Sequence, residues 1–291
     1  MTLSDTTPAA GTVPETATRA RASARTRARA ASALEPGSAS APGPAVVPGP
    51  AAGPGSALVL WDLDLTLLDP AGFGSRMITP VLADILGREP LMGASFAGRT
   101  DHAILTDLLV RNGMAVDDDE LILATMSAVA ERCERFADDL LAGGGGPLPG
   151  AHDAVHALAA DPQVHQGVVT GNMRRTALLK LRVCGFDGVP DPALGAFGDH
   201  HSDRAHLVSE AITLARGRGL GISPEHTVVV GDHIHDVRGA LDAGARCIGV
   251  ATGRVSAEKL HAAGAHVVLP DLTDPDALVD AVRSIARAEA N

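Results

Sequence analysis

The chain has 291 residues, of which 45% are hydrophobic and 2% aromatic, and its 24 basic and 35 acidic side chains give a net charge of −11. This length is enough for one or two domains, and the acidic excess argues against a nucleic acid or an anionic membrane as a partner of the folded part. Because the chain has no Tyr and a single Trp, its core must consist of aliphatic side chains, and aromatic platforms for stacking bases are not expected.

Residues 1–56 form the first segment, which is rich in Ala, Pro, Gly, Ser and Thr and nearly lacks large apolar side chains. Such a composition buries too little surface to offset the entropy of ordering, so we predict a disordered tail. The tail carries several arginines without an intervening acid: Arg19, Arg21, Arg25, Arg27 and Arg29. An organellar transit peptide or a polyanion-binding arm has this charge pattern, but a solvated tail is the simplest interpretation.

From Ala57 onward, short apolar runs alternate with helical patterns, and the first run is Leu58-Val59-Leu60-Trp61. Continuous apolar runs are typical of strands buried on both faces of a parallel sheet. Further runs lie at 168–169, 228–230, 247–250 and 267–269, and helical patterns at 150–160, 173–184, 203–216, 234–243, 256–263 and 274–288. This alternation predicts a doubly wound α/β sheet, whose ligands bind beyond the carboxyl ends of the strands.

Residues 73–145 break the alternation, because they show only amphipathic helical spacing, at 82–86, 104–109 and 121–141. We therefore predict a helical cap over 73–145, inserted into an α/β core formed by 57–72 and 146–291. The insertion ends in four consecutive glycines and a proline, Gly143 to Pro147. These glycines suit a hinge for a lid over the active face, although a plain connector would look the same.

Paired acids follow the first predicted strand, in Asp62-Leu63-Asp64. Alternate residues of an extended chain point the same way, so both carboxylates are expected at the end of the strand. Carboxylates this close repel one another unless a proton or a cation lies between them, and Mg²⁺ is the natural hard cation. A pair of acids that caps a turn is the alternative.

Two later strands also end in polar residues. Val228–Val230 is followed by Gly231-Asp232, and Asp236 lies one helical turn further on, so both acids are expected near one face. Val168-Val169 is followed by Thr170-Gly171-Asn172, where a hydroxyl and free backbone amides suit a phosphate. Helix N-caps would explain either motif alone, but all three motifs fall at strand ends that share one crevice.

Together, the three motifs resemble those of the haloacid dehalogenase superfamily. Its DxDxT motif matches Asp62, Asp64 and Thr66, its second motif matches Thr170, and its GDxxxD motif matches Gly231, Asp232 and Asp236. The resemblance covers about residues 57–270, and the segment from Phe96 to Asp101 resembles the phosphoglycolate phosphatase-like branch. The superfamily also has a lysine before the fourth motif. That region has no lysine here, so Arg204 is the first candidate for this cation and Lys180 the second.

The resemblance implies a magnesium-dependent phosphatase for a small phosphorylated metabolite. Asp62 would be the nucleophile and Asp64 the general acid and base. Mg²⁺ would be bound by Asp62, the backbone carbonyl of Asp64 and Asp232, with Asp236 nearby. Thr170, Gly171 and Asn172 would bind phosphate together with Arg204 or Lys180, and Arg99 in the cap would contact an anionic end of the substrate. A sugar phosphomutase and a non-catalytic phosphate-binding module are the alternatives.

The three cysteines, Cys133, Cys184 and Cys247, are widely spaced and include no CxxC pair. This pattern predicts neither a disulfide framework nor a zinc site and favours a reducing compartment. No apolar run reaches the length of roughly 18–20 residues that crosses a bilayer, and the N-terminus lacks the apolar segment of a secretion signal. We therefore predict a cytoplasmic protein without a membrane partner. The sequence carries no signal for its oligomeric state.

Overall fold

The computed structural model describes residues 56–116, 119–201 and 203–287, so all of the predicted tail except Ser56 lies outside the described residues. A six-stranded parallel sheet forms the core, in the order β5-β4-β1-β6-β7-β8. The strands are β1 (Ala57–Trp61), β4 (Val164–Thr170), β5 (Ala196–Phe197), β6 (Thr227–Gly231), β7 (Arg246–Val250) and β8 (Val267–Leu269). From β1 the chain adds β4 and β5 on one side and then returns to add β6, β7 and β8 on the other, so the strand order reverses between β1 and β6.

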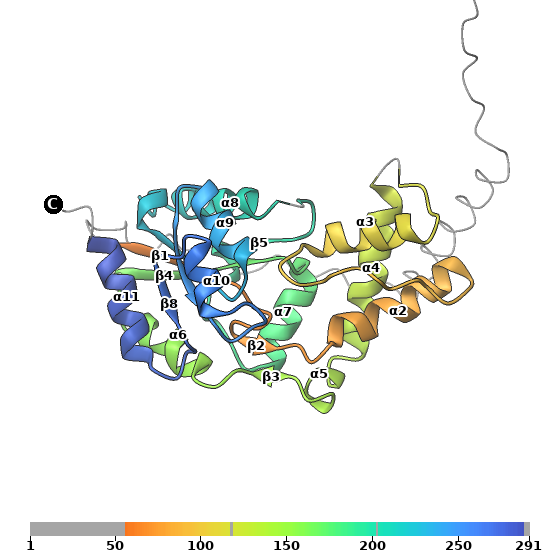
Figure 1. Ribbon diagram of the computed structural model, residues 1–291, viewed down its shortest axis with the longest axis horizontal. Coiled ribbons are helices and arrows are strands. Elements are labelled where there is room, and N and C mark those ends of the chain that lie inside the picture. The colour runs from red at the N-terminus through yellow and green to blue at the C-terminus, as the bar shows by residue number, and fades with distance from the viewer. Residues whose placement is uncertain (1–55, 117–118, 202, 288–291) are drawn as a thin grey trace, which may run out of the picture.

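Helices cover both faces of this sheet (Figure 1). α8 (Arg204–Gly217) and α9 (Ile234–Asp242) pack side by side on one face, and α6 (Ala151–Ala159) and α11 (Pro275–Arg287) on the other. α7 (Arg174–Val183), α10 (Ala257–Ala262) and the short 3₁₀ helices η1 (Pro192–Leu194) and η2 (Pro224–His226) complete the core. This arrangement and the helical cap confirm the predicted fold class.

The pleat of β1 explains why the run from Leu58 to Trp61 is apolar without interruption. Leu58 and Leu60 belong to the hydrophobic cluster under α8 and α9, whereas Val59 and Trp61 belong to the cluster on the opposite face. All four side chains are fully buried. Successive residues of a strand point to opposite faces, so a strand covered by helices on both sides needs apolar residues at every position.

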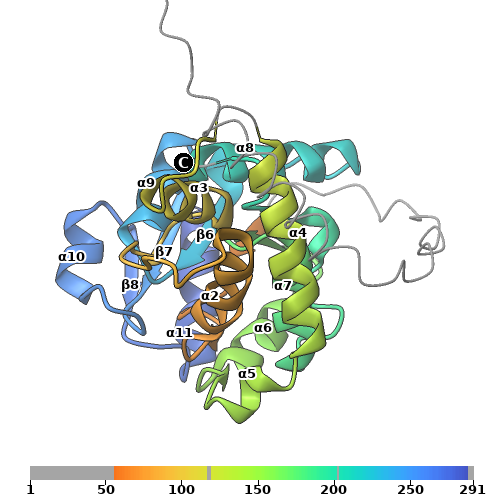
Figure 2. The same ribbon diagram turned by 90° about the vertical axis from the view of Figure 1, so that its right-hand side faces the viewer.

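The cap forms one end of the molecule, and Figure 2 shows it from that end. It contains α2 (Phe73–Leu86), α3 (Asp101–Arg111), α4 (Glu120–Arg135) and α5 (Asp139–Ala142). Its apolar side chains, among them Met77, Leu105 and Met126, belong to the same cluster as Val59 and Trp61. The pattern predicted over 121–141 is divided into α4 and α5, because Phe136 ends α4 and the chain turns before Asp139.

Three short strands were missed by the sequence analysis. β5 has two residues, and β2 (Leu68–Asp69) pairs antiparallel with β3 (Gly146–Pro147) where the chain enters and leaves the cap. A strand of two residues is too short to show the alternation of side chains that marks a strand in sequence, so only its pairing with another strand in the structure identifies it. Gly146 thus lies in this ribbon, and Gly143–Gly145 precede it.

Among the helices in the described ranges, none has the length and apolarity needed to cross a membrane. The three cysteines are free and buried.

Candidate functional site

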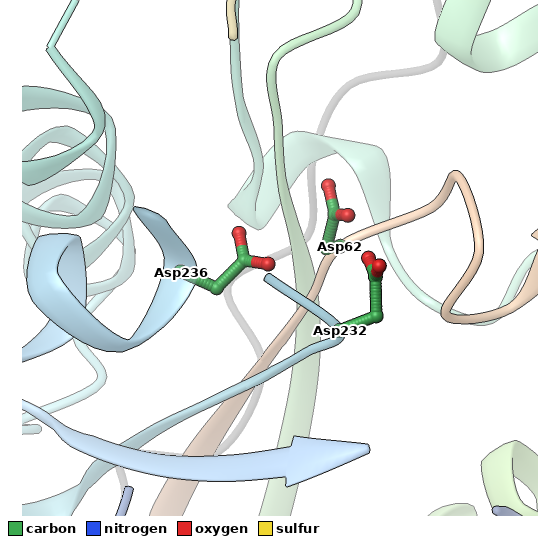
Figure 3. A group of neighbouring side chains, drawn as sticks. All are labelled: Asp62, Asp232 and Asp236. Atoms are coloured by element: carbon green, nitrogen blue, oxygen red, sulfur yellow. The ribbon is translucent and has the colours of Figure 1, made fainter. Parts of the chain in front are cut away.

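Three buried carboxylates from distant parts of the chain meet at the carboxyl ends of β1 and β6. Asp62 follows β1, Asp232 follows β6, and Asp236 lies in the first turn of α9. One ligand oxygen of each lies within 4.8 Å of those of the others, and Figure 3 shows the three side chains close together. A backbone hydrogen bond of 2.9 Å from the Asp62 amide to the carbonyl of Val230 holds the two strand ends together.

Two glycines make this close approach possible. A Cβ atom at Gly231 would lie 2.5 Å from Cγ of Asp236, and one at Gly253 would lie 1.8 Å from Oδ2 of Asp232. Real Cβ atoms do not approach other atoms so closely, so any larger residue would displace a carboxylate. The packing therefore explains the glycine before Asp232, and it shows a second glycine, at position 253, that sequence analysis did not single out.

Burial and mutual repulsion raise the pKa of these acids. Desolvation, together with the nearby carboxylates of Asp236 and Asp64, raises the pKa of Asp62 to about 7, although Arg204 opposes the shift. Desolvation and the charges of Asp62 and Asp236 raise the pKa of Asp232 to about 8. Burial also raises the pKa of Asp236. Acids that resist ionisation beside one another form a site where a bound cation is strongly favoured.

Arg204 lies beside two of these acids. It is the first residue of α8, is only 8% exposed, and forms hydrogen bonds to Asp236 and, over 3.3 Å, to Oδ1 of Asp62. Asp236 uses its other oxygen to accept a hydrogen bond of 3.0 Å from the amide of His233, which caps α9. Asp236 therefore both stabilises the start of α9 and pairs with Arg204.

The half-buried Asp64 lies outside the three-carboxylate cluster and contacts two buried polar side chains, Lys180 and Asn172. Lys180, which is 3% exposed, places its Nζ 2.7 Å from each oxygen of Asp64. Asn172 donates from Nδ2 to Oδ2 of Asp64 over 3.1 Å and accepts a hydrogen bond from Lys180. The two candidate cations thus bind different acids, Arg204 the Asp62 group and Lys180 the Asp64 group.

Thr170, Gly171 and Asn172 continue from the end of β4 toward Asp64. Thr170 is fully buried, and its Oγ1 accepts hydrogen bonds of 3.3 Å from both the amide and Nδ2 of Asn172. The N-cap of α7 is Met173, so Asn172 does not cap this helix as the alternative interpretation expected. Of the three residues, Asn172 contacts Asp64 directly, and Thr170 is joined to Asp64 through Asn172.

A cavity of about 710 Å³ opens between the core and the cap, and residues of both line it. Asp62, Asp64, Asp232, Lys180 and Arg204 form its core side. The cap contributes the apolar residues Ile78, Phe96, Ile104 and Val129 and the charged residues Arg99 and Asp101. The Arg99 guanidinium is engaged within the cap, because it lies 3.2 Å from Oδ2 of Asp107 and donates to the carbonyl of Ala103.

Sequence analysis gave Asp101 no role in this site, although the residue was named at the end of the Phe96–Asp101 segment. An acid in the first turn of a helix is expected for its effect on that helix alone. The signal that distinguishes Asp101 is its contact with the core loop after β4, which only the fold reveals.

The raised acid pKa values predict that the metal-free protein loses stability as the pH rises. A carboxyl group with a higher pKa in the folded state stabilises below its unfolded pKa near 4, and this stabilisation is lost as the pH rises through the folded values of about 7 to 8. In EDTA, the urea midpoint should therefore fall less between pH 5 and pH 8 in Asp232→Asn than in the wild type. Asp84→Asn, an exposed acid of α2, serves as the control and should follow the wild type. If the urea midpoint changed with pH equally in Asp232→Asn and wild type, the raised pKa of Asp232 would be contradicted.

Comparisons with known proteins agree with this geometry. A family model described as HAD-hydrolase-like matches residues 205–275, which include Asp232 and Asp236. No curated protein matches the chain significantly. Among solved structures, the chain is similar to a hydrolase from Pseudomonas syringae, with 22% identity, a TM-score of 0.56, and coverage of 78% of this chain and 98% of that one.

Two further structures have the same fold over nearly their whole length. CbbY from Rhodobacter sphaeroides, solved in complex with phosphate, has 20% identity and a TM-score of 0.59, covering 77% of this chain and 99% of that one. A predicted phosphatase from Clostridium acetobutylicum has 18% identity and a TM-score of 0.57, with the same two coverages. The family-model match over 205–275 and the fold shared with these solved structures are consistent with a hydrolase of the haloacid dehalogenase superfamily.

Proposed function

We propose that the chain is a magnesium-dependent phosphatase that hydrolyses a small phosphorylated metabolite through an aspartyl-phosphate on Asp62. The observation that supports this most is the meeting of three buried acids with Arg204 at the end of a cavity shared by core and cap. Phosphate in complex with CbbY of the same fold is consistent with the proposal.

The donor set fits a hard divalent cation, because Asp62, Asp232 and Asp236 offer only carboxylate oxygens and no described His or Cys joins the cluster. Their raised pKa values show a repulsion that a cation would relieve. Asp62, Asp232 and the backbone carbonyl of Asp64 would hold Mg²⁺, supported by Asp236. When bound, Mg²⁺ would neutralise charge on the phosphoryl oxygens and keep Asp62 ionised.

In this proposal, Asp62 attacks phosphorus in line with the leaving oxygen. Thr170 and the amides of Gly171 and Asn172 bind phosphoryl oxygens, as does Arg204. Asp64 donates a proton to the leaving oxygen and then takes a proton from the water that hydrolyses the aspartyl-phosphate. Arg99 would contact an anionic end of the substrate after releasing Asp107.

The contacts of the two cations support separate roles. Arg204 touches the proposed nucleophile Asp62, so we assign it the part of the missing lysine, whereas Lys180 touches the proposed acid Asp64. We expect Arg204→Met to reduce kcat/KM about 10²–10³-fold for both p-nitrophenyl phosphate and phenyl phosphate, since a lost charge contact to the phosphoryl group affects both.

Lys180→Met should instead harm phenyl phosphate more than p-nitrophenyl phosphate, because p-nitrophenolate leaves with little help from an acid. Steady-state kinetics of both variants on both esters measures this difference. Arg238→Met, at an exposed position of α9, is the control for Arg204→Met. If Arg204→Met kept full activity while Lys180→Met lost activity on both esters equally, the two assignments would be reversed.

The proposed function is tested by phosphate release from a panel of phosphorylated metabolites, including phosphoglycolate, by the full chain with Mg²⁺. Release from at least one member supports the phosphatase. Transfer of phosphate between positions of one sugar would instead identify a phosphomutase. Binding of phosphate without turnover of any ester would identify a non-catalytic module.

We also propose the division into a cap over 73–145 and a core over 57–72 and 146–291, and a cytoplasmic location. The two-stranded ribbon of β2 and β3 supports the first, because it lies where those boundaries fall. The free, buried cysteines support the second.

A further inference from the structure

The segment Gly98 to His102, here called the cap tip, reaches from the cap onto the loops that follow β4 and β5. The amide of Asp101 donates to the carbonyl of Gly171 over 2.7 Å, and the amide of His102 donates to the carbonyl of Gly198 over 3.2 Å. In return, the amide of Met173 donates to Oδ2 of Asp101 over 2.7 Å. Core and cap are thus joined here by hydrogen bonds in both directions.

Glycines create the space in which the cap tip lies. A Cβ atom at Gly171 would lie 2.1 Å from the carbonyl oxygen of Arg99, and one at Gly198 would lie 2.9 Å from Cβ of Thr100. On the cap side, a Cβ atom at Gly98 would lie 2.3 Å from Nδ1 of His233. The docked position therefore depends on residues without side chains on both surfaces.

Asp101 of the cap contributes to capping the N-terminus of α7, a helix of the core. Met173 is the N-cap residue of α7, and its side chain accepts no hydrogen bond from the helix. The amide of Met173 is bound by Asp101 of the cap, and that of Arg174 by Asp199 of the core over 2.8 Å. A carboxylate at a helix N-terminus is also favoured by the helix dipole.

The capped helix carries the lysine of the site. Lys180 lies two turns into α7 and binds Asp64 and Asn172, while Asn172 directly precedes Met173. Burial raises the pKa of Asp101 to about 6, and the Lys180 ammonium opposes this shift while Asp64 and Asp199 add to it. Asp101 is therefore largely ionised at pH 8, which gives the hydrogen bond to Met173 a charged acceptor.

From these contacts we infer that Asp101 is a positioning residue through which docking of the cap tip orders Asn172 and Lys180 around Asp64. The inference rests on the proposed function for the role of Asp64, but the docking itself does not. When the cap tip leaves the core, the amide of Met173 at the start of α7 loses its acceptor, Asp101. The carbonyl of Gly171, in the loop that holds Asn172, loses its donor, the amide of Asp101. Proton transfer by Asp64 then becomes dependent on the closed cap.

The test combines hydrogen exchange with kinetics in the full chain with Mg²⁺. Asp101→Ala removes the carboxylate, Asp101→Asn keeps an acceptor without the charge, and Gly171→Ala keeps Asp101 but pushes against Arg99. In Asp101→Ala, exchange within 171–176 should accelerate roughly 10- to 100-fold, since one charge-assisted hydrogen bond is lost. Exchange in β1 and β6 should stay unchanged. Gly171→Ala should resemble Asp101→Ala, and Asp101→Asn should lie between Asp101→Ala and wild type.

The kinetic arm uses phenyl phosphate and p-nitrophenyl phosphate. Asp101→Ala should lower kcat about tenfold or more for phenyl phosphate and less for p-nitrophenyl phosphate, because only the first ester depends strongly on the proton from Asp64. Glu134→Gln is the matched control. Glu134 also joins cap to core, through Arg175 over 2.8 Å, but it is exposed and distant in sequence from the loop after β4. The variant Glu134→Gln should leave both the hydrogen exchange at 171–176 and the kinetics on the two esters unchanged.

Three results would overturn the inference. They are unchanged exchange at 171–176 in Asp101→Ala, acceleration spread equally over β1 and β6, or faster exchange with kinetics like those of the wild type. If the wild type hydrolyses neither ester nor any member of the metabolite panel, the proposed function fails, and the exchange data alone then decide whether Asp101 docks the cap.

Discussion

Asp62→Asn is expected to reduce turnover of p-nitrophenyl phosphate by about 10⁴-fold or more, the scale on which loss of a nucleophile acts. Asn has nearly the same shape as Asp but cannot attack phosphorus to form an acyl phosphate. Asp62 is buried at the end of β1, with Arg204 on one side and Asp232 on the other, so no second carboxylate can take its place without moving a strand end.

The measurement is initial rates in saturating Mg²⁺, with circular dichroism to show that the variant is folded. Folding should be retained or improved, because the substitution removes an acid whose pKa burial raises to about 7. Asp84→Asn provides the matched change at an exposed site in the cap. Undiminished turnover by Asp62→Asn would remove the covalent mechanism altogether.

Removal of divalent metal is expected to have the second-largest effect. After dialysis against EDTA, turnover should fall by about 10³-fold or more, because Asp62 and Asp232 then retain protons near neutral pH and the phosphoryl charge is left unneutralised. Added Mg²⁺ should restore it. Asp232→Asn should raise the Mg²⁺ concentration for half-maximal activity at least about tenfold, since one of the two carboxylates that would bind the ion directly is lost.

Titration of activity with Mg²⁺ measures both effects. Asp280→Asn is the control, because Asp280 is exposed on α11, on the far side of the core from the cap. Full activity in EDTA, or an identical Mg²⁺ requirement in Asp232→Asn and wild type, would refute a metal role for these acids.

The core could be predicted from sequence because β1 and β6 are buried on both faces and so appear as uninterrupted apolar runs. The acids that follow them were identifiable for the same reason, since the end of a parallel strand fixes where the next side chains lie. β5 was not predicted because it has only two residues. The division between α4 and α5 was not predicted because the apolar spacing continues across the turn between them.

The partners of the acids could not be predicted in the same way. Lys180 lies ten residues after Thr170 within a helix, and whether it reaches Asp62 or Asp64 depends on the rotation and packing of α7. Asp101 begins a helix of its own, so nothing in the local sequence reveals that its carboxylate caps a different helix. Such contacts depend on how α7 packs against the sheet and on how the cap packs against the core.

The ribbon of β2 and β3 brings the two ends of the helical insertion side by side, because Leu68 pairs with Pro147 and Asp69 with Gly146. An insertion whose ends adjoin leaves the topology of its host unaltered, whatever its length. The connections of the sheet therefore do not depend on the inserted helices, although the cap and the core share a hydrophobic cluster. A grafting experiment could replace α2 to α5 with another helical module, or a short turn, while the six-stranded sheet and its acids keep their connections.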